Sequence, residues 1–177
     1  MTQFKQGWYI IYVRPMKEKS ISFYLDQKKV EFFLPLMKQQ RQWHDRKKTI
    51  LTPLFPGYIF VKLTNMTDYF NSINIEGVIR FLKSENSPVL ISQSVIDQVT
   101  LLVNNGTGLD VTESFFEKGS RILVEEGALA GISGEVVQHN GANRILVRLS
   151  VLNKNLLVNI PTEIASLLPD TASLQLA

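Results

Sequence analysis

Residues 55–61, Phe-Pro-Gly-Tyr-Ile-Phe-Val, constrain the fold more than any other stretch of this chain. The Pro-Gly pair indicates a turn, and the β-branched and aromatic run behind it predicts a strand. Because strand side chains alternate between faces, Tyr58 and Phe60 point one way and the aliphatic residues beside them the other. This pattern suits a sheet with a core beneath and rings offered to a partner above. A strand buried on both faces is the alternative.

Chain length and composition limit the class of protein. A chain of 177 residues forms one large domain or two small ones. Cysteine is absent, which suits a reducing compartment, and no apolar run reaches the roughly 18 residues of a membrane helix. The first residues carry no apolar segment typical of a secretory signal. We therefore expect a cytoplasmic protein with no membrane partner.

The charge is divided unevenly along the chain. Residues 1–105 hold 14 Lys and Arg against 8 Asp and Glu, whereas residues 106–177 hold 5 against 8. A basic first half and a mildly acidic second half indicate different partners, with a polyanion facing the first.

The first half predicts an antiparallel sheet. Helical spacing predicts a helix at Met16–Lys29 and another after Ser92, a candidate N-cap, and Thr67–Ile73 is a candidate short helix. Lys38–Lys48 is polar and predicts a long hairpin or loop. The predicted strands are Trp8–Val13, Val30–Leu34, Tyr58–Leu63 and Val78–Leu82. The order β-α-β-β-α-β is the split βαβ arrangement, with helices on one face of the sheet and the other face open.

The second half has a different sequence pattern. Short runs with turns between them predict strands at Arg121–Glu125, Glu135–His139, Arg144–Val151 and Leu156–Ile160. Such spacing indicates a small β-barrel, so the predicted fold class is α+β. Pro161-Thr162-Glu163 predicts one short helical turn. The expected domains are residues 1–103 and 115–170, joined by a linker at 104–114 and followed by a tail at 171–177.

Catalysis finds little support in the sequence. His44-Asp45 is the one candidate for base or metal chemistry, but it lies in a charged segment without a second histidine nearby. No glycine pattern for phosphate or dinucleotide binding is present. We expect no enzyme, no cofactor and no metal, and an enzyme built around His44 and Asp45 stays the remote alternative.

Basic side chains beside aromatic ones indicate nucleic-acid binding. The Lys38–Lys48 segment suits phosphate contact and base stacking, or is a solubilising hairpin; it holds Lys38, Arg41, Trp43, Arg46, Lys47 and Lys48. Tyr12 lies near Arg14, Lys17 and Lys28 and could hold an unpaired nucleotide, or Tyr12 is ordinary sheet packing. Residues 57–61 also half match an RNA-recognition signature, so a ribosome-associated RNA-binding module is a second hypothesis.

Four segments, in order, resemble the NusG/RfaH-type transcription elongation factors over about residues 7–168. They are Trp8-Tyr9, the run at 55–61, Gly77-Val78-Ile79-Arg80-Phe81 leading to Pro88, and a KOW-type segment. The last comprises Phe116-Glu117-Lys118-Gly119, Val124, Gly127, Gly131, Gly134 and Val136-Val137. This resemblance implies a polymerase-binding N-terminal domain followed by a KOW barrel.

The resemblance also implies a function. The N-terminal domain of the family binds the clamp helices of the largest RNA polymerase subunit, suppressing pausing and termination without catalysis. The matching polymerase-binding positions are Phe55, Pro56, Tyr58, Phe60 and Phe81. We expect a monomer.

Finer features resemble the operon-specific paralogues, such as those serving surface polysaccharide operons, and the housekeeping NusG factor is the alternative. Paralogues also bind the non-template DNA strand, and the matching surface holds Tyr12, Arg14, Lys17, Tyr24 and Lys28. Glu76 departs from the basic residue expected there. Leu152 matches the KOW position that contacts a ribosomal protein or Rho. Because Gly131 and Gly134 disfavour a helix, we expect this domain to be a β-barrel.

Overall fold

The computed structural model describes residues 4–42, 47–84, 87–105, 107–112, 119–127, 129–139, 142–149, 152, 154–159 and 165–167. The chain divides into two compact units, Met1–Asp97 and Gln98–Ala177. Each unit has its own antiparallel sheet.

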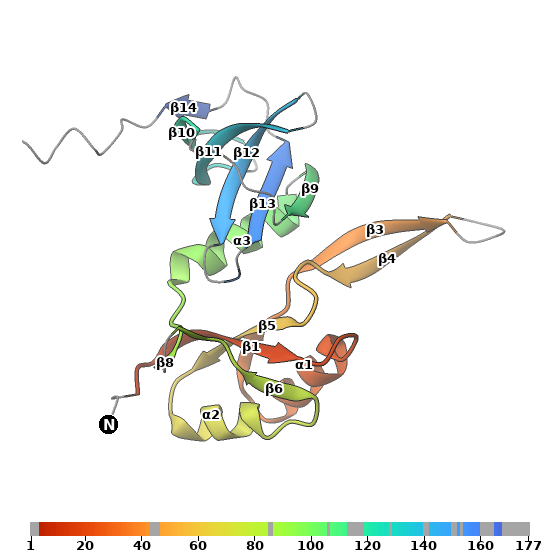
Figure 1. Cartoon of the computed structure of the whole chain (residues 1–177), viewed down its shortest axis with the longest axis vertical. Coiled ribbons are helices and arrows are strands. Elements are labelled where there is room, and N and C mark those ends of the chain that lie inside the picture. The colour runs from red at the N-terminus through yellow and green to blue at the C-terminus, as the bar shows by residue number, and fades with distance from the viewer. Residues whose placement is uncertain are drawn as a thin grey trace, which may run out of the picture. The chain divides into compact units, whose positions relative to one another are not determined.

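The first unit is built on a four-stranded sheet with the strand order β2-β5-β1-β6. Its elements are β1 (Gly7–Val13), α1 (Glu18–Gln27), β2 (Glu31–Phe33), β3 (Leu36–Gln42), β4 (Lys47–Pro53), β5 (Tyr58–Leu63), α2 (Met66–Ile73), β6 (Val78–Phe81), β7 (Lys83–Ser84) and β8 (Ser87–Pro88). Helix α3 (Gln93–Asn105) starts in this unit and ends in the second. All neighbouring strands of the sheet are antiparallel, so the predicted split βαβ arrangement is confirmed (Figure 1).

One face of this sheet forms the core of the unit. Alternate residues of β1 and β5 point into it, including Ile11 and Val61, and Ile21 and Leu25 of α1 pack against them. Ile21 and Leu25 are four residues apart and so lie on one side of the helix. Tyr69 and Ile73 of α2 pack on the same core, so both helices cover a single face, as the sequence predicted.

The polar segment between β2 and β5 forms a hairpin. Strands β3 and β4 pair from Leu36 opposite Pro53 to Gln42 opposite Lys47. Figure 1 shows the two strands running away from the four-stranded sheet as a separate ribbon. The hairpin interpretation of this segment is therefore confirmed over the described residues.

The range predicted as a linker holds regular structure. Its first two residues complete α3, and Thr107–Thr112 form β9, which pairs with β13 (Lys154–Asn159). The glycine-rich sequence carries a weak strand signal, and the backbone bonds to β13 decide the local structure instead. The domain boundaries at 103 and 115 stay a prediction.

The second unit is a six-stranded antiparallel sheet of barrel-like type, with the strand order β14-β10-β11-β12-β13-β9. The remaining strands are β10 (Arg121–Val124), β11 (Ser133–His139), β12 (Ala142–Leu149) and β14 (Ala165–Leu167). The four strands predicted here are present, and β14 was not predicted. Residues 161–163 and the tail at 171–177 lie outside the described residues.

A close approach of strands in this unit requires Gly134. A Cβ atom there would lie 2.6 Å from Cγ2 of Ile145 and 2.7 Å from the carbonyl oxygen of Leu146. Only glycine allows β11 to approach β12 so closely.

The helices and antiparallel sheets of the two units confirm the predicted α+β fold class, with a KOW-like set of C-terminal strands.

Candidate functional site

The sheet face opposite the helices carries a row of two tyrosines and an arginine. Tyr12 of β1 lies opposite Tyr58 of β5 on one side and Arg80 of β6 on the other. The two tyrosine ring centroids are 5.3 Å apart, and the Arg80 guanidinium carbon lies 5.9 Å from the Tyr12 ring. Directly opposed side chains of an antiparallel pair share one face, so these three groups form one cluster.

A second row on the same face is apolar. Phe60 of β5 lies opposite Ile10 of β1 and Phe33 of β2. The Phe60 ring lies 5.9 Å from that of Phe33 and 6.1 Å, edge to face, from that of Phe55. We refer to the two rows together as the aromatic sheet face, which comprises Ile10, Tyr12, Phe33, Tyr58, Phe60 and Arg80.

The expectation of two bare rings is wrong for Phe60. Its side chain is only 1 % exposed, whereas Tyr58 is half-buried and Pro56 is exposed. Phe33 and Phe55 pack against Phe60 on this face, and Phe55 is itself fully buried. The alternation of side chains along β5 places Phe60 on the correct face of the sheet. It could not show that neighbouring side chains cover the Phe60 ring.

Phe81 lies on the opposite face from Tyr58. It belongs to the core under the helices, where its ring stacks on Tyr69 of α2 at 4.6 Å and meets Tyr9 edge to face at 6.4 Å. The expectation that Phe81 stands beside the other polymerase-binding candidates is therefore wrong. Arg80 takes that place, because alternation along β6 sends successive side chains to opposite faces.

A third row closes one end of this face. Lys62 lies opposite both Trp8 and Glu31. Its ammonium group is 3.0 Å from a Glu31 carboxylate oxygen and 5.7 Å from the Trp8 ring. The Trp8 indole nitrogen donates a hydrogen bond of 2.7 Å to Gln93. The hydrogen bond to Gln93 joins β1 to the first residue of α3.

The turn before Tyr58 is fastened to helix α1 by a buried carboxylate. Glu18 is only 4 % exposed and accepts a 2.8 Å hydrogen bond from the Gly57 backbone N–H. Gly57 has φ of +84°, and a Cβ there would lie 3.1 Å from the Tyr12 ring. Glycine is required for this backbone conformation. The Gly57 carbonyl in turn accepts a 2.8 Å bond from the Val13 N–H, so the turn, α1 and β1 form one rigid corner.

The predicted nucleic-acid residues fall into two groups. Arg14, Lys17, Tyr24 and Lys28 are exposed, whereas Tyr12 is half-buried beside Tyr58. Tyr24 is 48 % exposed and lies 5.8 Å, edge to face, from the ring of Phe23, which is also exposed. The structure adds Phe23 and Arg80 to the candidates. The β6 alternation could have identified Arg80, whereas the helical spacing of α1 alone does not single out Phe23.

The basic hairpin is described only in part. Lys38 and Lys48 are exposed on β3 and β4, and in the strand register Arg41 lies opposite Lys48 and Gln42 opposite Lys47. Trp43, Arg46 and the His44-Asp45 pair lie outside the described residues.

Leu152, the candidate contact of the KOW unit, is buried, with 7 % of its surface exposed. A buried side chain does not meet a partner without a local rearrangement, so a contact through Leu152 stays a prediction.

Within the part of the chain that the structure describes, His, Asp and Glu form no group of three that could hold a metal ion. The same residues contain no helix long and apolar enough to cross a membrane. The described residues thus form two antiparallel units, one of which carries the aromatic sheet face.

Comparison with known proteins identifies the family. The family model described as NusG, transcription termination factor nusG, matches residues 6–100. The chain is similar to the transcription termination/antitermination protein NusG of Rickettsia felis, with 24% identity over 159 residues that cover 83% of this chain and 82% of that protein. The protein of the same name from Helicobacter pylori (strain ATCC 700392 / 26695) is 28% identical over 119 residues, 65% of this chain and 67% of that protein.

The fold agrees with this similarity. A solved structure described as domain interaction in Thermotoga maritima NusG superposes with a TM-score of 0.56 at 18% identity, covering 91% of this chain and 96% of that one. Because the family model spans more than half of the sequence, the chain belongs to the NusG family of transcription termination factors. Proteins of this family are transcription factors, not enzymes.

Proposed function

We propose that this protein is a transcription elongation and antitermination factor that binds the clamp helices of RNA polymerase through the aromatic sheet face. The observation that carries the proposal is the row of Tyr58, Tyr12 and Arg80 beside the buried ring of Phe60. It acts as a monomer in the cytoplasm, where the polymerase works.

The roles of the site residues differ with their exposure. Tyr58 and Pro56 remain accessible and would touch the clamp helices, whereas Phe55 and Phe60 are buried and pack edge to face against each other. Covering the rest of the Tyr58 ring would contribute about 1–2 kcal/mol, and Tyr and Arg are the residues that most often dominate interfaces. Arg80 would add a charged contact at the edge of the same surface.

The mechanism needs no chemical step by the factor. A domain bound to the clamp helices bridges the DNA channel and disfavours clamp opening. Because a pause requires the polymerase to rearrange, a restrained clamp shortens pauses and lets transcription pass terminators.

Two further contacts belong to the same proposal. The non-template DNA strand would bind the exposed cations and ring near α1, namely Arg14, Lys17, Tyr24 and Lys28, next to Tyr12. Stacking of a base on Tyr24 and phosphate contacts to the cations suit a single strand. The second unit would bind a ribosomal protein or Rho near Leu152.

We further propose that the protein serves one set of long operons rather than most genes. The Val151-Leu152-Asn153-Lys154 sequence and the basic, aromatic surface of α1 support this role. Chromatin occupancy of the tagged protein tests it. Occupancy confined to a few operons is the expected result, and occupancy on most transcribed genes would identify the housekeeping factor instead.

A second candidate function rests on the position of the two tyrosines. Tyr12 and Tyr58 lie on the central strands β1 and β5, where RNA-recognition sheets stack bases. Co-purification distinguishes the two functions. Recovery with core polymerase supports the elongation factor, and recovery only with ribosomal RNA supports an RNA-binding module.

The decisive experiment is transcription through a terminator in vitro with wild type and Tyr58→Ala. We expect read-through with wild type and near-background read-through with the variant. Phe70→Ala is the matched control, because Phe70 is an aromatic side chain of α2 that is 54 % exposed. Equal loss of read-through in both variants would contradict the proposal.

A further inference from the structure

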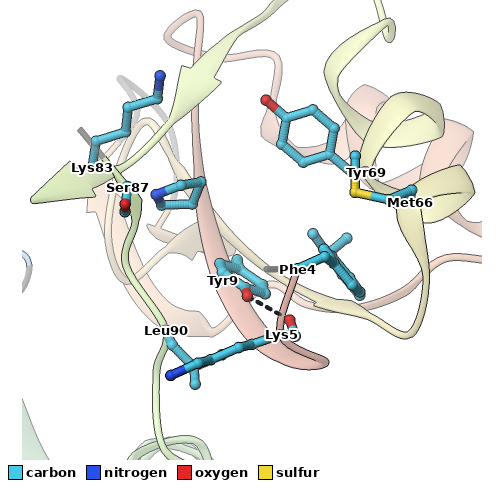
Figure 2. Close-up of a pocket in the computed structure, with 10 residues that line it drawn as sticks. Phe4, Lys5, Tyr9, Met66, Tyr69, Lys83, Ser87 and Leu90 are labelled. Atoms are coloured by element: carbon cyan, nitrogen blue, oxygen red, sulfur yellow. Dashed lines mark hydrogen bonds between the residues drawn. The ribbon is translucent and has the colours of Figure 1, made fainter. Parts of the chain in front are cut away.

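The first unit contains a pocket on the helix side of its sheet, away from the aromatic sheet face. Its volume is about 490 Å³, and its lining comes from the segment before β1, from the β5–α2 region and from the β7–β8 region (Figure 2). The lining residues are Phe4, Lys5, Tyr9, Leu63, Met66, Tyr69, Lys83, Ser87, Pro88 and Leu90. A cavity of a few hundred cubic ångströms with mostly apolar walls suits a small molecule.

Packed aromatic rings hold the inner wall of the pocket in place. Tyr9 and Tyr69 both pack on Phe81, which is fully buried. The Tyr9 hydroxyl donates a hydrogen bond to the Lys5 carbonyl oxygen, which fastens the segment before β1 to the wall. Burial raises the pKa of Tyr9, so the phenol stays neutral at ordinary pH.

The charges of the pocket have one sign. Lys5 and Lys83 line it with exposed side chains, and none of the lining residues is Asp or Glu. Figure 2 shows both lysines on the side across from Tyr69 and Met66. Ser87 adds a hydroxyl near Lys83. The pocket therefore combines an apolar, aromatic side with a cationic one.

We propose that this pocket binds a small amphipathic carboxylic acid, with an apolar ring system against Tyr69 and Met66 and the carboxylate on the side that carries both Lys5 and Lys83. An organic cation would face two like charges, and a neutral apolar molecule would leave the ammonium groups without a partner anion. Because the pocket and the aromatic sheet face lie on opposite sides of the sheet, the acid leaves the polymerase contact free. This site is independent of the proposed function.

Binding of 2-naphthoate to the full-length chain tests the proposal, measured by amide chemical shifts. We expect saturable binding with shifts at Tyr9, Leu63 and Leu90, and affinity that falls as salt is added. Neutral 2-naphthamide should bind about fivefold to tenfold more weakly, the effect of two exposed ion pairs.

Two variants separate the contributions of charge and shape. Lys5→Gln/Lys83→Gln should weaken 2-naphthoate about fivefold to tenfold and leave 2-naphthamide unchanged. Met66→Ala, at a half-exposed position, should weaken both compounds alike. Lys38→Gln/Lys48→Gln is the matched control, because it removes two exposed lysines of the β3–β4 hairpin and should change neither affinity.

Three results would overturn the proposal. The first is 2-naphthoate affinity that does not depend on Lys5 and Lys83. The second is shifts confined to the aromatic sheet face. The third is saturable binding of the peptide Asp-Phe-Asp with none of 2-naphthoate, which would identify the pocket as a protein-docking site instead.

Discussion

The two faces of the N-terminal sheet are both rich in aromatic residues, yet the rings on the two faces differ in how deeply they are buried. On the helix face, Tyr69 of α2 stacks on Phe81 and Tyr9 meets Phe81 edge to face, so these rings form part of the core. On the aromatic sheet face, burial falls from Phe60, packed against Phe33 and Phe55, to the half-buried Tyr58. The same residue type thus stabilises the fold on one side and remains accessible on the other.

The largest expected effect separates the two faces by stability. Phe81→Ala should lower the free energy of unfolding of the first unit by about 3–5 kcal/mol, because it leaves a cavity beneath α2. Tyr58→Ala should cost less than half of that, because its ring is half-buried. Urea unfolding monitored by amide signals of the first unit measures both. A Tyr58→Ala loss equal to that of Phe81→Ala would remove the distinction between the faces.

A smaller loss of stability is expected at the corner formed by α1, β1 and the turn before Tyr58. Glu18→Ala should lower the free energy of unfolding by about 1–3 kcal/mol, because the Gly57 N–H loses its buried acceptor. It should also weaken polymerase binding, although Glu18 is not on the aromatic sheet face.

Glu18→Gln is the matched variant for this corner. Its amide oxygen can still accept the bond from Gly57, so both stability and binding should largely recover. If Gln and Ala behave alike, the hydrogen bond to the turn does not position Tyr58.

The smallest expected change in the free energy of unfolding is at the start of α2, on the helix face. Asp68 is partly buried, which raises its pKa, but hydrogen bonds from the Thr64 hydroxyl and backbone N–H to its carboxylate, together with Asn65, outweigh this and hold the pKa below its ordinary value. A lowered pKa stabilises the fold above the pH at which the unfolded carboxyl ionises. That stability is lost as pH falls through the folded value.

Asp68→Asn should therefore cost no more than about 1 kcal/mol near neutral pH, since the site is solvent-screened. The difference between wild type and variant should shrink below about pH 4. Thermal unfolding across this range measures it. A difference that grows towards acid pH would contradict the assignment.

The sequence predicted the first unit well because its signals are local. The turn before Tyr58 and the spacing of Ile21 and Leu25 each specify an element, and alternation along β5 specifies a face. It could not predict β9, whose pairing with β13 is a long-range contact. For the same reason it could not show that Phe55 closes over Phe60, or that Phe81 lies under α2.

We propose that the accessible part of the aromatic sheet face binds the clamp helices. Titrating the isotope-labelled full-length protein with a clamp-helix fragment of RNA polymerase tests it most directly. We predict the largest amide shifts at Tyr12, Tyr58 and Arg80, with little change at Phe70. Shifts centred on α2, with the three residues of the aromatic sheet face unchanged, would contradict the account.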